Sequence, residues 1–195
     1  MATDTEADER ILILQARRGS RDAIAALVAR YSHGLFRYLL SLSGDPALAE
    51  DLLQDTWLRV MERLDSYRPG YPFRNWLFTV ARNRAFDVLR QRSRRLPHWR
   101  ADTAEGLAHP AEEVPDPNPS VLEKLAEADL AQFVMKAMKS LPAAFREVLT
   151  LRFEQELDIG AIARILRLPA SAVKDRLYRG LDQLRLRTER LAKHG

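Results

Sequence analysis

Cysteine is absent from this chain of 195 residues. Its absence excludes disulfide bonds, thiolate nucleophiles and cysteine-based metal sites, and it suits the reducing cytosol. Long apolar runs are lacking too, because no stretch approaches the roughly 18 residues of a membrane-spanning helix. The N-terminal stretch MATDTEADER is acidic and therefore unlike a secretory signal. We expect a cytoplasmic protein without membrane insertion.

Strand-like and catalytic patterns are scarce as well. β-branched residues do not alternate with polar ones, whereas aliphatic residues, alanine and arginine are plentiful, which is typical of an all-α fold. The sequence contains no glycine-rich phosphate loop and no H-E-x-x-H pair. We therefore expect no enzyme, no catalytic residue, no metal site and no cofactor. The histidines are scattered along the chain, at His33, His98, His109 and His194.

The net charge of +4 is modest, but the charges are segregated along the chain. Residues 84–100 hold six arginines against one aspartate, and residues 101–123 hold six acidic residues and no lysine or arginine. Beyond Arg164 the chain becomes basic again. This order of basic, acidic and basic segments favours two polyanion-binding modules joined by an acidic connector.

Helical periodicity predicts two small helical domains, at residues 1–96 and 120–195, and a chain of this length suits two modest cores. Between them, residues 97–119 are acidic and proline-rich without an apolar period, which predicts a flexible linker. Asp45 and Pro46 predict a helix start, as N-cap and first helical residue. The expected helices cover residues 8–19, 21–44, 46–67, 73–95, 121–140, 143–154, 158–167 and 170–191.

Residues 157–185 have the spacing of a helix-turn-helix. Asp158 can cap a first short helix, and the turn RLP follows it. Arg167 stands in this turn, where glycine would avoid the cost of a left-handed backbone conformation. The apolar stripe expected to dock the second helix consists of Val173, Leu177, Leu181 and Leu184.

The remaining surface of this second helix is polar and net basic. In a helix-turn-helix the second helix enters the major groove with its N-terminal half toward base edges, which predicts contacts with duplex DNA. An ordinary helical hairpin with a solvated basic face is the alternative. The residues expected near bases or phosphates are Ser171, Lys174, Asp175, Arg176, Tyr178 and Arg179, with Arg176 toward a flank.

The helix expected at residues 73–95 has a second unusual surface. Its buried stripe is predicted to contain Leu77, Val80, Ala81, Ala85 and Val88. Aromatic residues interleaved with amides and arginines on the opposite side suit stacking on unpaired bases and neutralisation of phosphates. The alternative is that Trp76 and Phe86 are covered by a neighbouring helix. The opposite side gathers Asn75, Trp76, Thr79, Arg82, Asn83, Phe86 and Arg90.

The preceding helix carries a leucine within an acidic and amide face. Such a face favours docking of another protein, and a merely solvated face is the alternative. The residues of this stripe are Asp51, Gln54, Asp55, Leu58 and Glu62, opposite an apolar side that includes Leu52 and Trp57.

Two long segments resemble a known family. The segment AEDLLQDTWLRVMERLDSYRPGYPFRNWLFTVARNRAFDVLRQRSRR is similar to region two of bacterial RNA polymerase sigma factors of the extracytoplasmic-function group, group IV of the sigma-70 family. The segment LPAAFREVLTLRFEQELDIGAIARILRLPASAVKDRLYRGLDQLR is similar to region four of the same family. The two motifs, in this order and separation, are highly specific.

The resemblance implies an alternative sigma factor that binds core RNA polymerase and directs it to promoter DNA. It implies contacts of Asp51, Gln54, Asp55 and Leu58 with the coiled-coil clamp of the polymerase β′ subunit, and of region four with the β flap. It further implies that Tyr67 and the helix residues Asn75, Trp76, Arg82, Asn83 and Arg90 capture the melted −10 element. The helix from Ser171 to Arg179 would read the −35 element.

The resemblance also implies control by an anti-sigma factor that covers the polymerase-binding faces. A helix-turn-helix regulator without a polymerase subunit role is the alternative function. That alternative explains the C-terminal helices, but it gives no purpose to the Trp76 and Asn83 surface or to the stripe around Leu58.

Overall fold

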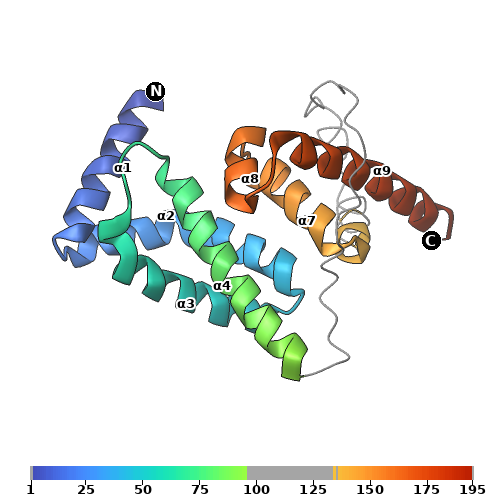
Figure 1. The fold of residues 1–195 in the computed structure, drawn as a ribbon, viewed down its shortest axis with the longest axis horizontal. Helices are drawn as coiled ribbons and strands as arrows, with labels where there is room; N and C mark the ends of the chain where they lie inside the picture. Colours follow the sequence, from blue (N-terminus) through green and yellow to red (C-terminus); the bar gives the residue numbers. More distant parts are fainter. Residues whose placement is uncertain (1, 96–133, 135, 195) are drawn as a thin grey trace. The chain divides into compact units, whose positions relative to one another are not determined.

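The computed structural model describes residues 2–95, 134 and 136–194, and in these residues it contains helices and no strands, as the sequence predicts. The chain divides into two compact units, Met1–Leu89 and Arg90–Gly195. Figure 1 shows the helices in chain order. They are α1 (Ala2–Arg17), α2 (Arg21–Ser43), α3 (Pro46–Arg63), the short η1 (Leu64–Ser66), α4 (Phe73–Arg95), α7 (Ala143–Leu149), η2 (Thr150–Glu154), α8 (Ile159–Leu166) and α9 (Ala170–His194).

The predicted linker at 97–119 and the first part of the helix predicted at 121–140 lie outside the described residues, while residues 134 and 136–140 are helical as predicted. The predicted domain boundaries therefore stay predictions. Within the described part of the chain, no helix is both long and apolar enough to cross a membrane.

Local signals fix the ends of the helices in the first unit. The hydroxyl of Ser20 accepts a hydrogen bond from the Ala23 backbone N–H and caps α2, which ends at Gly44 in the left-handed conformation with φ of 68°. The Asp45 carboxylate accepts from the backbone N–H of Ala47 at 3.0 Å and caps α3, as predicted. Helix α1 begins earlier than predicted, at Ala2.

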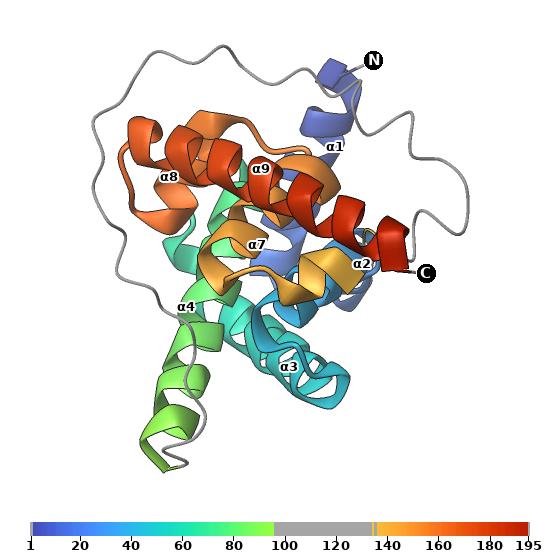
Figure 2. The same ribbon diagram turned by 90° about the vertical axis from the view of Figure 1, so that its right-hand side faces the viewer.

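The core of the first unit lies where α1, α3 and α4 meet the long helix α2. Helices α2 and α3 run side by side in both views (Figures 1 and 2). Leu35, Tyr38 and Leu39 of α2 are fully buried, and the Tyr38 ring lies 5.3 Å from the ring of Phe78 on α4, measured between centroids. This core holds α3 and α4 so that each presents its other face outward.

In the second unit, α9 lies across α7 and α8 (Figure 2). Gly180 makes the approach of α9 to α7 possible, because a Cβ at this position would meet Leu149 Cδ1 at 3.2 Å and Phe145 Cβ at 3.3 Å. The helix predicted at 143–154 changes to π-helical geometry at Thr150. Such a turn accommodates one extra residue in a helix.

The helix-turn-helix is formed by α8 and α9, which begin after Asp158 and at Ala170 as predicted, and α9 continues to His194, past the predicted end at residue 191. The Asp158 carboxylate accepts a hydrogen bond from the Ala161 backbone N–H at 2.6 Å. Arg167 ends α8 in the left-handed conformation, with φ of 57°. The cost expected at this turn is therefore present in the structure, because arginine has a Cβ that this conformation brings close to the backbone.

Candidate nucleic-acid interface and docking surface

Helix α3 presents the predicted docking stripe to solvent. Asp51 and Gln54 are exposed. Leu58, one turn further along the helix, is 63% exposed. Met61 continues the exposed apolar surface by one further turn. The opposite side of α3 is buried, with Leu52 and Trp57 in the core. An exposed leucine and methionine among acids and amides form a surface that a protein partner can cover.

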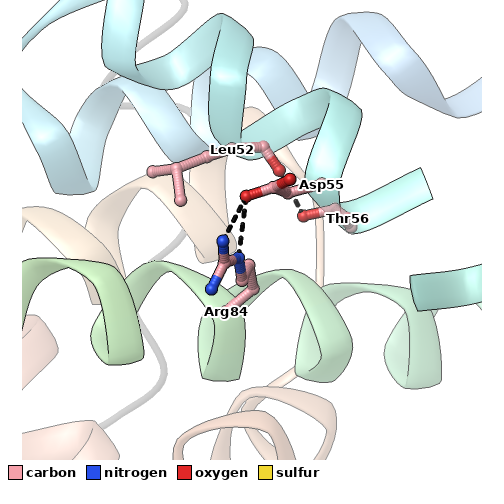
Figure 3. Close-up of polar contacts among 4 residues, drawn as sticks. All are labelled: Leu52, Asp55, Thr56 and Arg84. Carbon is pink, nitrogen blue, oxygen red and sulfur yellow. Dashed lines mark hydrogen bonds and ion pairs between the residues drawn. The ribbon is translucent and has the colours of Figure 1, made fainter. Parts of the chain in front are cut away.

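Asp55 belongs to the same stripe, but its carboxylate also has a partner within the chain (Figure 3). Arg84 of α4 donates to Asp55 Oδ2 from Nε at 2.9 Å and also from a terminal nitrogen. The side chains are 25% exposed for Arg84 and 38% for Asp55. Beside them, the Thr56 hydroxyl donates to the Leu52 carbonyl at 2.7 Å. The ion pair thus joins the docking helix to the helix predicted to contact DNA.

Tyr67, predicted to face DNA, is only 7% exposed. Its hydroxyl donates to the Tyr71 carbonyl at 2.5 Å, which closes the loop before α4. Its ring centroid lies 5.4 Å from that of Phe73 and 5.5 Å from that of Trp76. Burial raises the pKa of Tyr67, and Glu9 adds to the rise while Arg10 and Arg17 oppose it. The side chain is therefore a neutral phenol at neutral pH.

Helix α4 confirms most of the predicted buried stripe, with Leu77, Val80, Ala81 and Ala85 buried. Two positions differ. Val88 is half-buried while Leu89 is buried in its place. The placement of Asn75 on the outer face was wrong, because this residue is only 5% exposed. Asn75 lies in the first turn of α4, next to the preceding loop. Helical periodicity predicts burial from the residues of one helix and takes no account of such a loop.

The rest of the predicted outer face of α4 is accessible in part. Trp76, Arg82 and Asn83 are half-buried, and Arg90 is exposed. The Arg82 guanidinium lies 4.4 Å from the centroid of the Phe86 ring, so that cation and aromatic share one surface. Trp76 is partly covered by the ring of Phe73 on the same helix and by the ring of Tyr67 in the preceding loop. Neither belongs to a neighbouring helix, and Trp76 and Phe86 are both half-buried.

Helix α9 docks through the predicted stripe. Val173, Leu177 and Leu184 are buried, and Leu181 is half-buried. Ser171 and Lys174 near the N-terminus of α9 are exposed, as a groove-reading surface requires.

The other four predicted DNA contacts of α9 are half-buried: Asp175, Arg176, Tyr178 and Arg179. Asp175 and Arg179 form an ion pair, with 3.0 Å between Arg179 Nε and Asp175 Oδ1. This pair is half-exposed and one turn apart, so it orients both side chains on the outer face at little energetic gain.

Among the arginines that were not singled out from the sequence, two contact other elements of the first unit near the candidate sites. One is Arg84, described above, and the other is Arg17, which reaches from α1 to backbone carbonyls between Leu64 and Tyr67. Arg84 and Asp55 are 29 residues apart in the sequence, and Arg17 and Leu64 are 47 residues apart. A short-range sequence pattern does not indicate pairs at such separations. Across the described residues, no group of three His, Cys, Asp or Glu side chains could hold a metal ion.

Comparisons with known proteins agree with both units. The Sigma-70 region 2 family matches residues 27–95, and the Sigma-70, region 4 family matches residues 137–186. The ECF RNA polymerase sigma factor SigW of Bacillus subtilis is 28% identical over 179 residues, which cover 89% of this chain and 92% of SigW. The ECF RNA polymerase sigma factor BldN of Streptomyces coelicolor is 34% identical over 175 residues, which cover 89% of this chain and 63% of BldN.

A solved structure has a similar fold. The sigma factor RpoE in complex with the anti-sigma factor NepR, from Bartonella quintana, matches with a TM-score of 0.65 and 25% identity. The match covers 85% of this chain and 96% of that chain.

Proposed function

The chain belongs to the extracytoplasmic-function sigma factors of the sigma-70 family, and on this premise we propose how its surfaces divide the work of transcription initiation. It is an alternative sigma factor, which brings core RNA polymerase to a particular set of promoters. The bond-forming chemistry would belong to the polymerase, and the chain would act in the cytoplasm as a recognition subunit.

We propose that the exposed stripe of α3 grips the coiled-coil clamp of the polymerase β′ subunit. The observation that carries this assignment is Leu58, which is 63% exposed between acidic and amide side chains. An exposed leucine contributes no favourable free energy while its side chain stays in water. Burial of Leu58 against a partner would remove its apolar surface from water and so stabilise the complex. Asp51, Gln54 and Asp55 would surround it with polar contacts.

Along α4 and the loop before it, we propose that half-buried Trp76, with the buried ring of Tyr67 packed against it, forms the aromatic surface against which a base of the unpaired −10 strand is held. Asn83 would contact that base, and Arg82 and Arg90 would neutralise phosphates. Asn75, being buried, would act by supporting the loop before α4.

In the second unit, we propose that α9 reads the −35 element as duplex DNA, with region four also contacting the β flap. Ser171, Lys174 and Asp175 would reach base edges. Arg176, Tyr178 and Arg179 would contact phosphates or neighbouring bases.

An anti-sigma factor is proposed as the regulator of this chain. The similar RpoE structure holds the anti-sigma factor NepR, and the exposed stripe of α3 would be available to such a protein when polymerase is absent. Occupation of that stripe by the regulator would exclude the polymerase by competition.

The docking assignment is tested by comparing two exposed leucines. We expect Leu58→Ala to weaken binding to core polymerase about tenfold, because a central apolar contact of an interface is lost. Leu14→Ala, on α1, changes a leucine of similar exposure, 51%, and is expected to leave the affinity unchanged. A wild-type chain that fails to bind core polymerase would favour the helix-turn-helix regulator instead.

The duplex-reading assignment is tested by promoter footprinting of the reconstituted holoenzyme. Replacement of Arg176 and Arg179 by alanine is expected to remove upstream protection while binding to core polymerase persists. Unchanged upstream protection would contradict the role of α9.

A further inference from the structure

Helix α1 (Ala2–Arg17) precedes the residues that the two families match, which begin at position 27. Helix α1 nevertheless packs against the rest of the first unit. Ile13 and Ala16 are buried, and α1 packs on α2. Near its middle, Glu9 accepts a hydrogen bond from the Tyr31 hydroxyl, and the Tyr31 ring lies 5.7 Å from that of Phe73. The helix is thus built against the aromatic cluster that contains Tyr67.

The last residue of α1, Arg17, contacts the segment that leads into this cluster. Its Nε donates to the Leu64 carbonyl at 3.0 Å, and one terminal nitrogen donates to the Tyr67 carbonyl. The same nitrogen has a longer contact, 3.5 Å, to the Asp65 carbonyl. The Leu64 carbonyl also accepts a hydrogen bond from the Tyr67 backbone N–H at 3.1 Å, so Arg17 is a second donor to it, attracted by the partial negative charge at the end of a helix.

Arg17 also touches Tyr67 itself. Its guanidinium carbon lies 5.8 Å from the centroid of the Tyr67 ring, within the range of a cation–π contact. One side chain therefore holds both the backbone and the ring of the same residue. Phe73 and Trp76 of α4 also contact this ring, with their centroids 5.4 Å and 5.5 Å from its own. Tyr67 is fixed between α1 and α4.

We propose that Arg17 is a positioning residue for strand capture, which holds Tyr67 and the loop before α4 in the geometry that receives an unpaired base. The inference rests on the proposed role of Tyr67 in the −10 contact. Its physical basis is preorganisation: a loop that is already ordered loses less conformational entropy when the strand binds. Helix α1 is accordingly part of the −10 module.

The test uses a matched pair of neighbouring arginines. Arg17→Gln and Arg18→Gln each remove one positive charge from the end of α1, so both change the general attraction of DNA to the same degree. Arg18 is exposed, and only Arg17 makes the contacts described above. Arg17→Lys is the conservative variant, which keeps the charge but lacks the planar fork that reaches two carbonyls.

The full-length variants are reconstituted with core polymerase. The probe is a random pool of single-stranded deoxyoligonucleotides of about 12 nucleotides. The motif that the wild-type holoenzyme enriches over core polymerase alone is then used to measure affinity. We expect Arg17→Gln to weaken binding of this strand about tenfold, Arg17→Lys about threefold, and Arg18→Gln not measurably. Binding of each variant to core polymerase should stay at the wild-type level.

The outcomes separate the inference from the function on which it rests. If the wild-type holoenzyme enriches no motif, the proposed −10 role of the first unit fails. If a motif is enriched but Arg17→Gln and Arg18→Gln bind it equally, the inference alone fails. If Arg17→Gln loses core polymerase binding and strand binding together, Arg17 only stabilises the fold, and the inference is again overturned. A loss confined to the strand supports it.

Discussion

The ion pair between Asp55 and Arg84 gives a quantitative prediction about how α3 is held to α4 (Figure 3). The perturbation is a double-mutant cycle of Asp55→Ala, Arg84→Ala and both together. The cycle isolates the pair's own contribution, because effects of each truncation on other neighbours cancel.

The structure sets the expected magnitude. Two nitrogens of Arg84 donate to one oxygen of Asp55, which is stronger than a single exposed contact. Fully exposed pairs contribute up to roughly 1 kcal/mol, and breaking buried ones costs about 3 to 5 kcal/mol. The side chains of Arg84 and Asp55 are 25% and 38% exposed, so solvent screens their attraction. The contribution of this pair should therefore lie closer to that of exposed pairs than to that of buried ones. We expect a coupling free energy of about 1 kcal/mol in the free energy of unfolding.

The assay is urea unfolding followed by tryptophan fluorescence. Trp57 on α3 and Trp76 on α4 report the first unit directly, and Trp99 is replaced by phenylalanine in all four proteins to remove its signal. High salt should reduce the coupling, since the pair is partly exposed. A coupling free energy below about 0.3 kcal/mol at low salt would refute this reasoning, because the geometry would then contribute nothing measurable.

Three further predictions concern single residues. Arg167→Gly should stabilise the second unit by about 1 kcal/mol by relieving the left-handed arginine, measured by hydrogen exchange of α8 and α9 amides; reduced protection would contradict this. Thr150→Val should stabilise it by about 1 kcal/mol, because the buried Thr150 hydroxyl has no hydrogen-bond partner among the described residues; the same exchange experiment checks it. The stability of the first unit should fall as pH rises above the ordinary tyrosine pKa of 10.0, since the folded chain holds the Tyr67 proton more tightly than the unfolded chain does. Urea titrations from pH 9 upward should show a weaker fall in Tyr67→Phe, and equal slopes would show that other groups cause it.

Sequence patterns predicted the fold where the deciding interactions are short-range. Asp45 and Asp158 cap their helices as expected, and Arg167 occupies the predicted left-handed turn, because a cap or a turn depends on residues a few positions apart. The apolar stripe of α9 also follows from its own sequence.

The candidate surfaces were predictable only in part. The docking stripe around Leu58 is exposed as expected, since a helix with one apolar face leaves the other outward. Asn75 is buried although the helical period places it on the outer face, and the contacts of Arg17 and Arg84 depend on which elements pack opposite them. The hydrophobic period of a single helix does not predict these features, because tertiary packing decides which side chains are buried and which arginine contacts which partner.

Gly180 shows how a close contact between two helices can constrain the substitutions that the second unit tolerates. The helix pair α7 and α9 is so close that any side chain at this position meets Leu149 and Phe145. In a library randomised at position 180, functional clones with a larger residue should carry a compensating, smaller residue at position 149, because the Leu149 atoms at the contact are its Cγ and Cδ1. The spacing between the two helices therefore ties the residue allowed at position 180 to the one at position 149.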